Sequence, residues 1–511
     1  MKKLFSLLPL LFTFYILSAQ NFEREADAYF DEGNFTAAQE LYLKTLKTDS
    51  TNVDAKHRLG ICYLGQNIER SVAIPLLEFV VKQDKFDTYA WYDLARAYHY
   101  NHQFDEAIAN YKKYIAEGRD DLFIKLAKLG KEQCENAKML IAKPIDVAFY
   151  NVGSDVNTEF NEFQPYIPAD ESTLVYTSDQ KFDSRYNVHI NNVYIAENDE
   201  GEWHRPLTVG VVNSGEDEFV SGLAANDEFV FIKYQRYEAF DDIFIAEKKE
   251  KRISRPESIG EFINTSAVES GATLSYSGDT LIFASDRDGG LGGLDLWMSL
   301  KLPNGNWATP INMGEPINTP YDEDFPHIMP DGKNMFFSST GHTSMGGYDV
   351  FKTKLNRTTG KWSKPQNFGY PVNNTYDNFT IAMSSNHRYA YVSDVRPEGK
   401  GGMDIYRIVF HNVNANIFLH KGEIVTGEGD NQTALSGDVD VEIKVHDVEN
   451  NKLFGKYQYN SDKNQFLLAL PPGSFTLFVN AEGFKPYKED VFVPDLLKNQ
   501  TYNIKVTLQS L

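Results

Sequence analysis

The chain has few cysteines and little positive charge. Only Cys62 and Cys134 occur in 511 residues, so the fold cannot depend on a framework of disulfides. Both lie in helical patterns, where we expect buried free thiols. The formal net charge of −22 argues against nucleic acid or an anionic membrane surface as a partner, because both require a basic face.

Short catalytic motifs are also missing. Neither Gly-x-Ser-x-Gly nor His-Glu-x-x-His occurs, and the 11 histidines are scattered. His99 and His102 have a spacing that can bind metal, but no third ligand is near them, so we interpret them as a surface or loop-end pair. The sequence therefore predicts that the chain is not an enzyme and has no catalytic residues, cofactor or metal.

The single long apolar run stands at the N-terminus. MKK precedes the 14-residue stretch LFSLLPLLFTFYIL, and LSA stands directly before Gln20. This run is too short to span a bilayer and no second one follows. It predicts a cleaved signal peptide at residues 1–19, a mature N-terminus at Gln20 and no direct membrane span. The expected location is the periplasm, free or associated with the outer membrane.

The first repeats are helical. YFDEGNFTAAQELYLKTL, YLGQNIERSVAIPLLEFVV and YHYNHQFDEAIANYKKYIA begin at Tyr29, Tyr63 and Tyr98. The second copy keeps Leu59 and Gly60 before Tyr63, and WYDLARAY opens the third. These motifs resemble the tetratricopeptide repeat family. The resemblance implies an α-solenoid over residues 20–143, capped by a helix from about Asp121 to Ala142. It makes Tyr63, Trp91 and Tyr98 candidate protein-binding residues.

Alternating strands follow. LVYTSD, FVFIKY, LIFASD, MFFSST and YAYVSD place aromatic residues at regular spacing, at Tyr176, Phe231, Phe283, Phe337 and Tyr391. A second strand follows each of them. Short strands in evenly spaced groups predict a five-bladed β-propeller over residues 144–412. The strands resemble the WD40-like PD40 repeat of the TolB type.

A Gly-x-x-[Ile/Val]-Asn element indicates how the ring closes. Copies begin at Gly153, Gly260, Gly314 and Gly369, and a copy one residue shorter begins at Gly210. The first copy precedes the first blade, and none follows the last. We therefore expect the strand IDVAFY at 145–150 to pair with DIYRIVF and close the ring, which removes two free sheet edges. The solenoid and the C-terminal domain would then leave from one blade and lie close together as a compact clamp.

A Gly-Gly-x-Asp motif recurs in SDRDGGLGGLDLW, SSTGHTSMGGYDVF and SDVRPEGKGGMDIY. One carboxylate persists per copy, whereas a calcium loop needs several oxygen ligands. A strand follows the glycines, whereas a phosphate cradle needs a helix. We interpret the motif as a structural turn in which glycine supplies positive φ and aspartate accepts backbone hydrogen bonds. The turn residues are Gly293, Gly347, Gly402, Asp295, Asp349 and Asp404.

The last segment, residues 413–511, alternates again and predicts a β-sandwich of the immunoglobulin or transthyretin-like kind. NQFLLALPPGSFTLFVNAEGF resembles the carboxypeptidase regulatory-like domain. The fold class is thus multidomain, α plus all-β. The order of parts resembles the PorE-type periplasmic proteins of the type IX secretion and gliding machinery of Bacteroidetes.

The PorE-type resemblance implies a non-enzymatic scaffold that binds other envelope proteins. That family normally continues into an OmpA-like domain, whereas this sequence ends after the sandwich, so either the protein lacks this wall anchor or the sequence is truncated. Direct peptidoglycan binding is therefore not carried over, and we expect contact with peptidoglycan only through partners. One alternative stays open: a glycan- or ligand-binding protein, or an enzyme, with its site in the propeller funnel.

Overall fold

The computed structural model describes residues 22–66, 70–168, 171–184, 188–199, 202–204, 206–235, 242–384, 387–411, 413, 418–427, 432–435, 439–448, 452–461, 463–471, 473–493 and 501–511. The expected signal peptide and its cleavage site before Gln20 lie outside these ranges. No helix within the ranges is long and apolar enough to cross a membrane.

The N-terminal region is helical, as predicted. A helix over residues 22–31 is followed by α2 (Phe35–Thr48), α3 (Val53–Gly65), the short η1 (Arg70–Val72), α4 (Ala73–Val80), α5 (Tyr89–Tyr100), α6 (Phe104–Glu117) and α7 (Asp121–Ile141). Asn34, Asn52 and Asp120 begin helices by accepting backbone hydrogen bonds, as good N-caps do. Ala38 and Ala73 are fully buried, so successive helices approach closely.

The strands from β1 to β23 form five sheets in the described residues. The first contains β2 (Glu162–Tyr166), β3 (Thr173–Asp183), β4 (Val188–Asp199), β5 (Glu202–Trp203) and β6 (Leu207–Thr208). The second contains β7 (Asp217–Leu223), β8 (Phe229–Gln235), β9 (Asp242–Lys249), β10 (Arg252–Ile253) and β11 (Glu257–Ser258). The third contains β12 (Glu269–Leu274), β13 (Thr280–Ser285), β14 (Asp295–Leu300) and β15 (Ile311–Asn312).

The other two sheets complete the β-rich region. The fourth contains β16 (Glu323–Ile328), β17 (Asn334–Ser339), β18 (Asp349–Asn356), β19 (Lys361–Trp362) and β20 (Gln366–Asn367). The fifth contains β1 (Val147–Asn151), β21 (Ala382–Met383), β22 (Tyr389–Asp394) and β23 (Asp404–Phe410). Because β1 comes from the start of the region and β23 from its end, the fifth sheet joins the two ends of this part of the chain.

Five hydrophobic clusters link these sheets in a cycle. One cluster joins the first sheet to the second, and three more join the second, third, fourth and fifth in order. The last returns from the fifth sheet to the first, where Tyr391 and Ile405 pack with Tyr176 and Tyr194. Apolar side chains on both faces of each sheet are thereby buried, which is the main favourable term in folding.

The fifth sheet closes through antiparallel pairing of β1 with β23. Val147 lies opposite Phe410, and Asn151 lies opposite Tyr406. This is the pairing expected for residues 145–150. The chain thus enters and leaves the β-rich region at one place, where the backbone N–H of His411 donates to the carbonyl oxygen of Asp146 at 3.2 Å.

Two further sheets follow. One contains β24 (Phe418–Thr426), β25 (Thr433–Ala434), β28 (Tyr459–Asn460), β29 (Gln465–Leu470) and β32 (Thr501–Leu508). The other contains β26 (Val441–Asp447), β27 (Lys452–Tyr457), β30 (Gly473–Ala481) and β31 (Tyr487–Val493). Alternate residues from the two sheets, among them Leu468 and Leu477, share one core.

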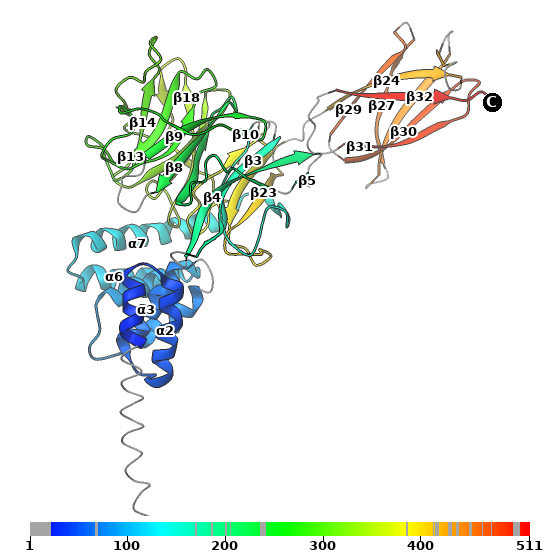
Figure 1. Ribbon diagram of the computed structural model, residues 1–511. Helices are drawn as coiled ribbons and strands as arrows, with labels where there is room; N and C mark the ends of the chain where they lie inside the picture. The colour runs from blue at the N-terminus through cyan, green and yellow to red at the C-terminus, as the bar shows by residue number, and fades with distance from the viewer. Residues whose placement is uncertain are drawn as a thin grey trace, which may run out of the picture.

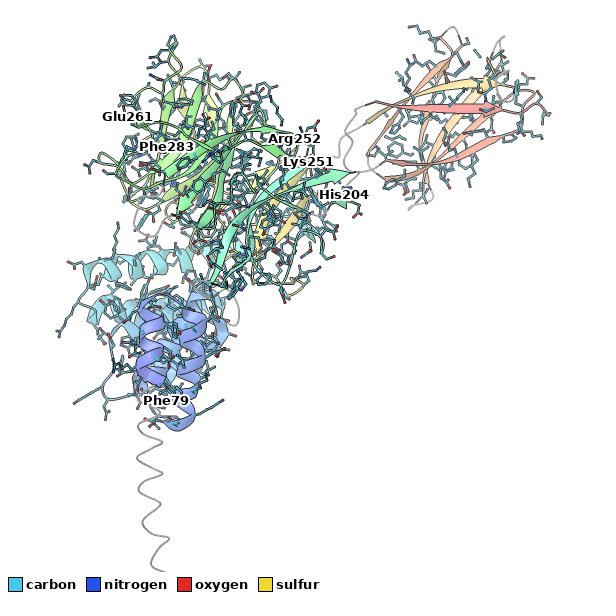
Figure 2. All side chains as sticks on the ribbon, in the orientation of Figure 1. Phe79, His204, Lys251, Arg252, Glu261 and Phe283 are labelled. Atoms are coloured by element: carbon cyan, nitrogen blue, oxygen red, sulfur yellow. The ribbon has the colours of Figure 1, made fainter. Side chains whose placement is uncertain are left out.

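The helical region and the C-terminal pair of sheets lie on opposite sides of the β-rich region (Figure 1). The expected compact clamp is therefore wrong. Its premise holds, since the start of β1 lies beside the end of β23, but the two parts extend away from the β-rich region in different directions (Figure 1). In Figure 2, Phe79 lies at the far end of the helical region, whereas His204 and Lys251 lie on the side toward the C-terminal sheets.

Candidate functional site

The aspartate of each Gly-Gly-x-Asp motif is fully buried and begins a strand. Asp295 accepts hydrogen bonds from the backbone N–H groups of Leu291 (2.5 Å) and Gly292 (3.2 Å). Asp404 accepts the equivalent pair from Lys400 and Gly401. The side chain thus satisfies donors that the tight turn leaves without a strand partner.

The glycines of the motif have another role than the one expected. Gly293, Gly347 and Gly402 are not among the glycines with positive φ, so that expectation is wrong. A Cβ at these positions would instead overlap a side-chain oxygen of the neighbouring segment, on Asp322, Asp377 and Asn161 respectively. The glycines are required because two repeats approach each other closely at this turn.

The Gly-x-x-[Ile/Val]-Asn elements hydrogen-bond to the third strand of each of the five sheets in the β-rich region. Asn318 accepts from the N–H of Leu296 at 2.9 Å and donates to its carbonyl oxygen at 3.0 Å. Asn213, Asn264 and Asn373 make the same pair of bonds with Val193, Ile243 and Val350. Asn157 makes it with Ile405, across 248 positions of sequence. The asparagine side chain thus supplies the hydrogen bonds that the backbone of a neighbouring strand would otherwise make.

Buried carboxyl groups at these turns have unusual acidity. Burial raises the pKa of Asp349 to about 8 and that of Glu323 to about 7. Glu323 accepts hydrogen bonds from the hydroxyls of Thr319 (2.7 Å) and Ser339 (2.6 Å), which partly offset its desolvation. These contacts stabilise the connection between consecutive sheets.

The helical region docks on the turns of the fourth sheet. The Nε2–H of His99 donates to the carbonyl oxygen of Met345 at 2.9 Å, and Asn136 donates to the carbonyl oxygen of Ser344 at 3.0 Å. Gln133 donates to the Ser344 hydroxyl at 3.2 Å. Met345 is fully buried in a cluster formed by helical residues. The helices are thus fixed to the β-rich region by apolar burial and by satisfied polar groups.

A cation that lies close to two aromatic rings strengthens this docking. The Tyr100 and Tyr376 rings lie parallel, with centroids 5.8 Å apart. The guanidinium of Arg70 lies 4.1 Å from the first ring centre and 4.5 Å from the second. Cation–π contacts of this kind contribute roughly 0.5–2 kcal/mol each. Arg70 and Tyr100 come from the helices and Tyr376 from the loop before β21, so the contact spans both regions.

The candidate binding residues of the helical repeats serve mainly in packing. Tyr63 is only 7% exposed and lies in the helical core. The hydroxyl of Tyr98 donates to Glu78 at 2.5 Å, and the Trp91 indole donates to Glu117 at 3.2 Å. The Nζ of Lys113 lies 3.8 Å from the centre of the Trp91 ring. Trp91 and Tyr98 remain half-buried, so part of each ring faces solvent.

Sequence reasoning missed the docking residues. His99 was expected at a surface or loop end, but it is 4% exposed, and burial lowers its pKa to about 4. Met345 occupies the position that Leu291 and Lys400 hold in the other motif copies. An apolar residue there was a weak signal, because Leu291 is half exposed. Cys62 and Cys134 are buried free thiols, as predicted.

The family model of the tetratricopeptide repeat matches residues 69–121. No curated protein matches the chain. Similar solved structures include a TolB from Agrobacterium tumefaciens described as putative, at 14% identity over 50% of this chain and 78% of that one, with a TM-score of 0.30. An α-L-arabinofuranosidase from Lactobacillus brevis is 12% identical over 51% of this chain and 92% of that one, with a TM-score of 0.33.

A β-1,2-mannobiose phosphorylase from Listeria innocua is 8% identical over 52% of this chain and 96% of that one, with a TM-score of 0.35. The prediction that this chain is not an enzyme is contradicted by the presence of glycoside hydrolases and phosphorylases among these structures. Their fold can be enzymatic, and the absence of short motifs in a sequence does not exclude catalysis.

Proposed function

We propose that the chain is a periplasmic protein-interaction scaffold, a component of the kind found in type IX secretion and gliding machinery. The observation that carries this proposal is the docking of α5 and α7 on the turns of the fourth sheet, with Met345 buried between them. A helical repeat and a β-rich region held in one orientation present two surfaces at a fixed distance. Such an arrangement suits simultaneous binding of two partners.

The proposal includes an architecture. The five sheets are the blades of a closed five-bladed β-propeller of the PD40 type over residues 144–412, and residues 413–511 form a carboxypeptidase regulatory-like sandwich. The cycle of five inter-sheet clusters and the β1–β23 pairing support the first part. The common core of the last two sheets supports the second.

The proposed partners are proteins of the cell envelope. The net charge of −22 disfavours nucleic acid and anionic membrane surfaces. Export by the signal peptide at residues 1–19 completes the proposal. Intact-mass measurement tests it: a mature chain beginning at Gln20 supports export, and a chain that retains Met1 contradicts it.

A second candidate function is ligand or glycan binding at the centre of the ring. Tyr166 of β2 and His327 of β16 come from sheets that are not neighbours in the cycle, yet their ring centroids lie 6.3 Å apart. The Tyr166 hydroxyl and His327 Nδ1 are buried without a hydrogen-bond partner among the described residues. Buried polar atoms of this kind are costly unless something pairs with them.

Mild cross-linking of the full-length chain in intact envelopes separates the two functions. A defined set of co-purified proteins, lost when Met345→Asp detaches the helical region, supports the scaffold. A chain with no protein partner whose melting temperature rises with a soluble oligosaccharide supports the ring-centre site instead.

A further inference from the structure

The fourth and fifth sheets enclose a cleft of about 560 Å³. Its apolar lining includes Phe336, Phe368 and Phe410. The ring centroids of Phe336 and Phe368 lie 5.5 Å apart, and those of Phe368 and Phe410 lie 6.1 Å apart. Lys352 and Lys354, both exposed, line the same cleft from β18. An aromatic floor and a cationic rim thus occur together.

The segment that supplies most of the lining of this cleft has a charge opposite to that of the chain. Residues 329–368 contain six cationic side chains, all exposed: Lys333, Lys352, Lys354, Arg357, Lys361 and Lys364. The same segment holds two aspartates. Asp349 is fully buried, and burial raises its pKa to about 8, so Asp331 is the exposed one. A local excess of cations on a chain of net charge −22 attracts anionic groups to this segment.

The six cations are not neutralised by the protein itself. In the part of the chain that the structure describes, none of them pairs with a carboxylate. Arg357 donates to the carbonyl oxygen of Asp331 at 2.7 Å, and the Nζ of Lys352 lies 5.6 Å from the centre of the Phe368 ring. Their charge is therefore available to a partner. Binding of an anionic partner to these side chains would break no ion pair within the described part of the protein.

We infer that this cleft binds an acidic segment of a partner protein, with one bulky apolar side chain of that segment seated on the partly exposed rings of Phe368 and Phe410, which pack over the buried Phe336. The cleft volume falls within the roughly 300–1,000 Å³ of typical binding pockets. The floor favours an apolar side chain over a free anion, because burial of apolar surface contributes about 25 cal/mol per Å². The lysines select carboxylates next to that anchor and repel basic sequences.

This inference names the chemistry of a partner and rests on the proposed scaffold function. The cleft lies beside Val413, where the chain leaves for the last two sheets. It is therefore on a different part of the β-rich region from the buried turn at Met345 that the helices occupy. A partner held here would leave the helical repeats free for another.

Fluorescence anisotropy with the full-length chain tests the inference. The probe is a fluorescein-labelled, Glu-rich peptide with one central Phe. We expect saturable binding that weakens with added salt and falls roughly tenfold or more in Lys352→Glu/Lys354→Glu. The control is Lys47→Glu/Lys128→Glu, which makes the same charge change at two exposed lysines of the helical region and should leave the affinity unchanged.

A peptide with the central Phe replaced by Ser should bind far more weakly. Equal binding of that peptide, or its complete competition by inorganic phosphate, would overturn the inference in favour of a general anion site. No saturable binding, or equal loss in both double variants, would also overturn it. If envelope cross-linking still captures the same proteins with Lys352→Glu/Lys354→Glu, the cleft inference fails while the scaffold stands.

Discussion

The Nδ2–H of Asn151 donates a hydrogen bond to Oδ2 of Asp404 at 2.8 Å, across 253 positions of sequence. Asn312 and Asn367 make the same contact with Asp295 and Asp349, which are only 17 and 18 positions away. One structural unit is therefore assembled locally in two sheets and from distant segments in the fifth. Ring closure reproduces the chemistry of an ordinary repeat.

Replacement of Asn151 by Leu should lower the free energy of unfolding by about 1–3 kcal/mol, because Asp404 and the N–H of Gly153 both lose a partner. The exposed Asn306→Ala is the control and should change little. Deletion of residues 147–151 should expose the edge of β23 and cause aggregation. Urea unfolding and light scattering measure the two effects; a monomeric, stable deletion variant would show that β1 is dispensable.

Asp349→Ala should lower the free energy of unfolding by roughly 1–3 kcal/mol, because it leaves the Met345 N–H without an acceptor and removes one of the two hydrogen bonds that the Asn367 amide donates. Asp349→Asn should cost much less, since its carbonyl oxygen can accept both bonds. Calcium and a chelator should leave the melting temperature unchanged. A shift of several degrees with calcium that vanishes in the Ala variant would instead assign the turn to a metal.

The contribution of Asp349 to stability should fall as pH rises from about 4 toward pH 8. The pKa of Asp349 rises from 3.8 to about 8 on folding. Between these values the unfolded state has released a proton that the folded state retains, so each pH unit costs at most about 1.4 kcal/mol. Asp349→Asn removes this share. Denaturant unfolding of the native protein and of Asp349→Asn at pH 5 and pH 8 measures this difference. If the unfolding free energies of the two proteins change equally with pH, the raised pKa of Asp349 is contradicted.

Gly347→Ala should destabilise the fold by roughly 1–3 kcal/mol, because the new Cβ overlaps Oδ1 of Asp377 and displaces it from the Tyr348 N–H. Gly210→Ala is the matched control, since a Cβ there has open space. Thermal unfolding of the two variants compares them. Equal melting temperatures would mean that the close approach of the repeats is not restrictive.

Much of this fold could be predicted from the sequence, because each structural element recurs in several repeats. Each Gly-x-x-[Ile/Val]-Asn copy predicted an element, and the displaced first copy indicated where β1 pairs. The reason for the Gly-Gly pairs could not be predicted, since it depends on a contact with the next repeat. The backbone preference of glycine predicts a positive φ. The need for a residue without a Cβ becomes clear only when the neighbouring repeat is in place.

The docking of the helices was also hidden. His99 lies at helical spacing from apolar residues, and nothing in its neighbourhood names Met345, which is 246 positions away. The cationic cleft was hidden for a different reason. The chain as a whole is strongly negative, so its net charge gave no sign that residues 329–368 carry an excess of positive charge.

Met345→Asp should detach the helical region, because a charge at this fully buried position is expensive. Small-angle scattering should then show a larger radius of gyration. Limited proteolysis should cleave the chain near Lys143 faster than in the native protein. Met139→Asp, at a residue of α7 that is 63% exposed, should scatter like the native protein. An unchanged radius for Met345→Asp would mean that other contacts suffice to hold the two regions together.

The most direct test of the scaffold is mild cross-linking in cells that produce the chain, followed by identification of the proteins bound to the native form and to Met345→Asp. The account predicts a reproducible set of envelope proteins on the native chain, part of which is lost from the variant. Recovery of no protein from either form, together with binding or cleavage of a glycan by the purified chain, would contradict it.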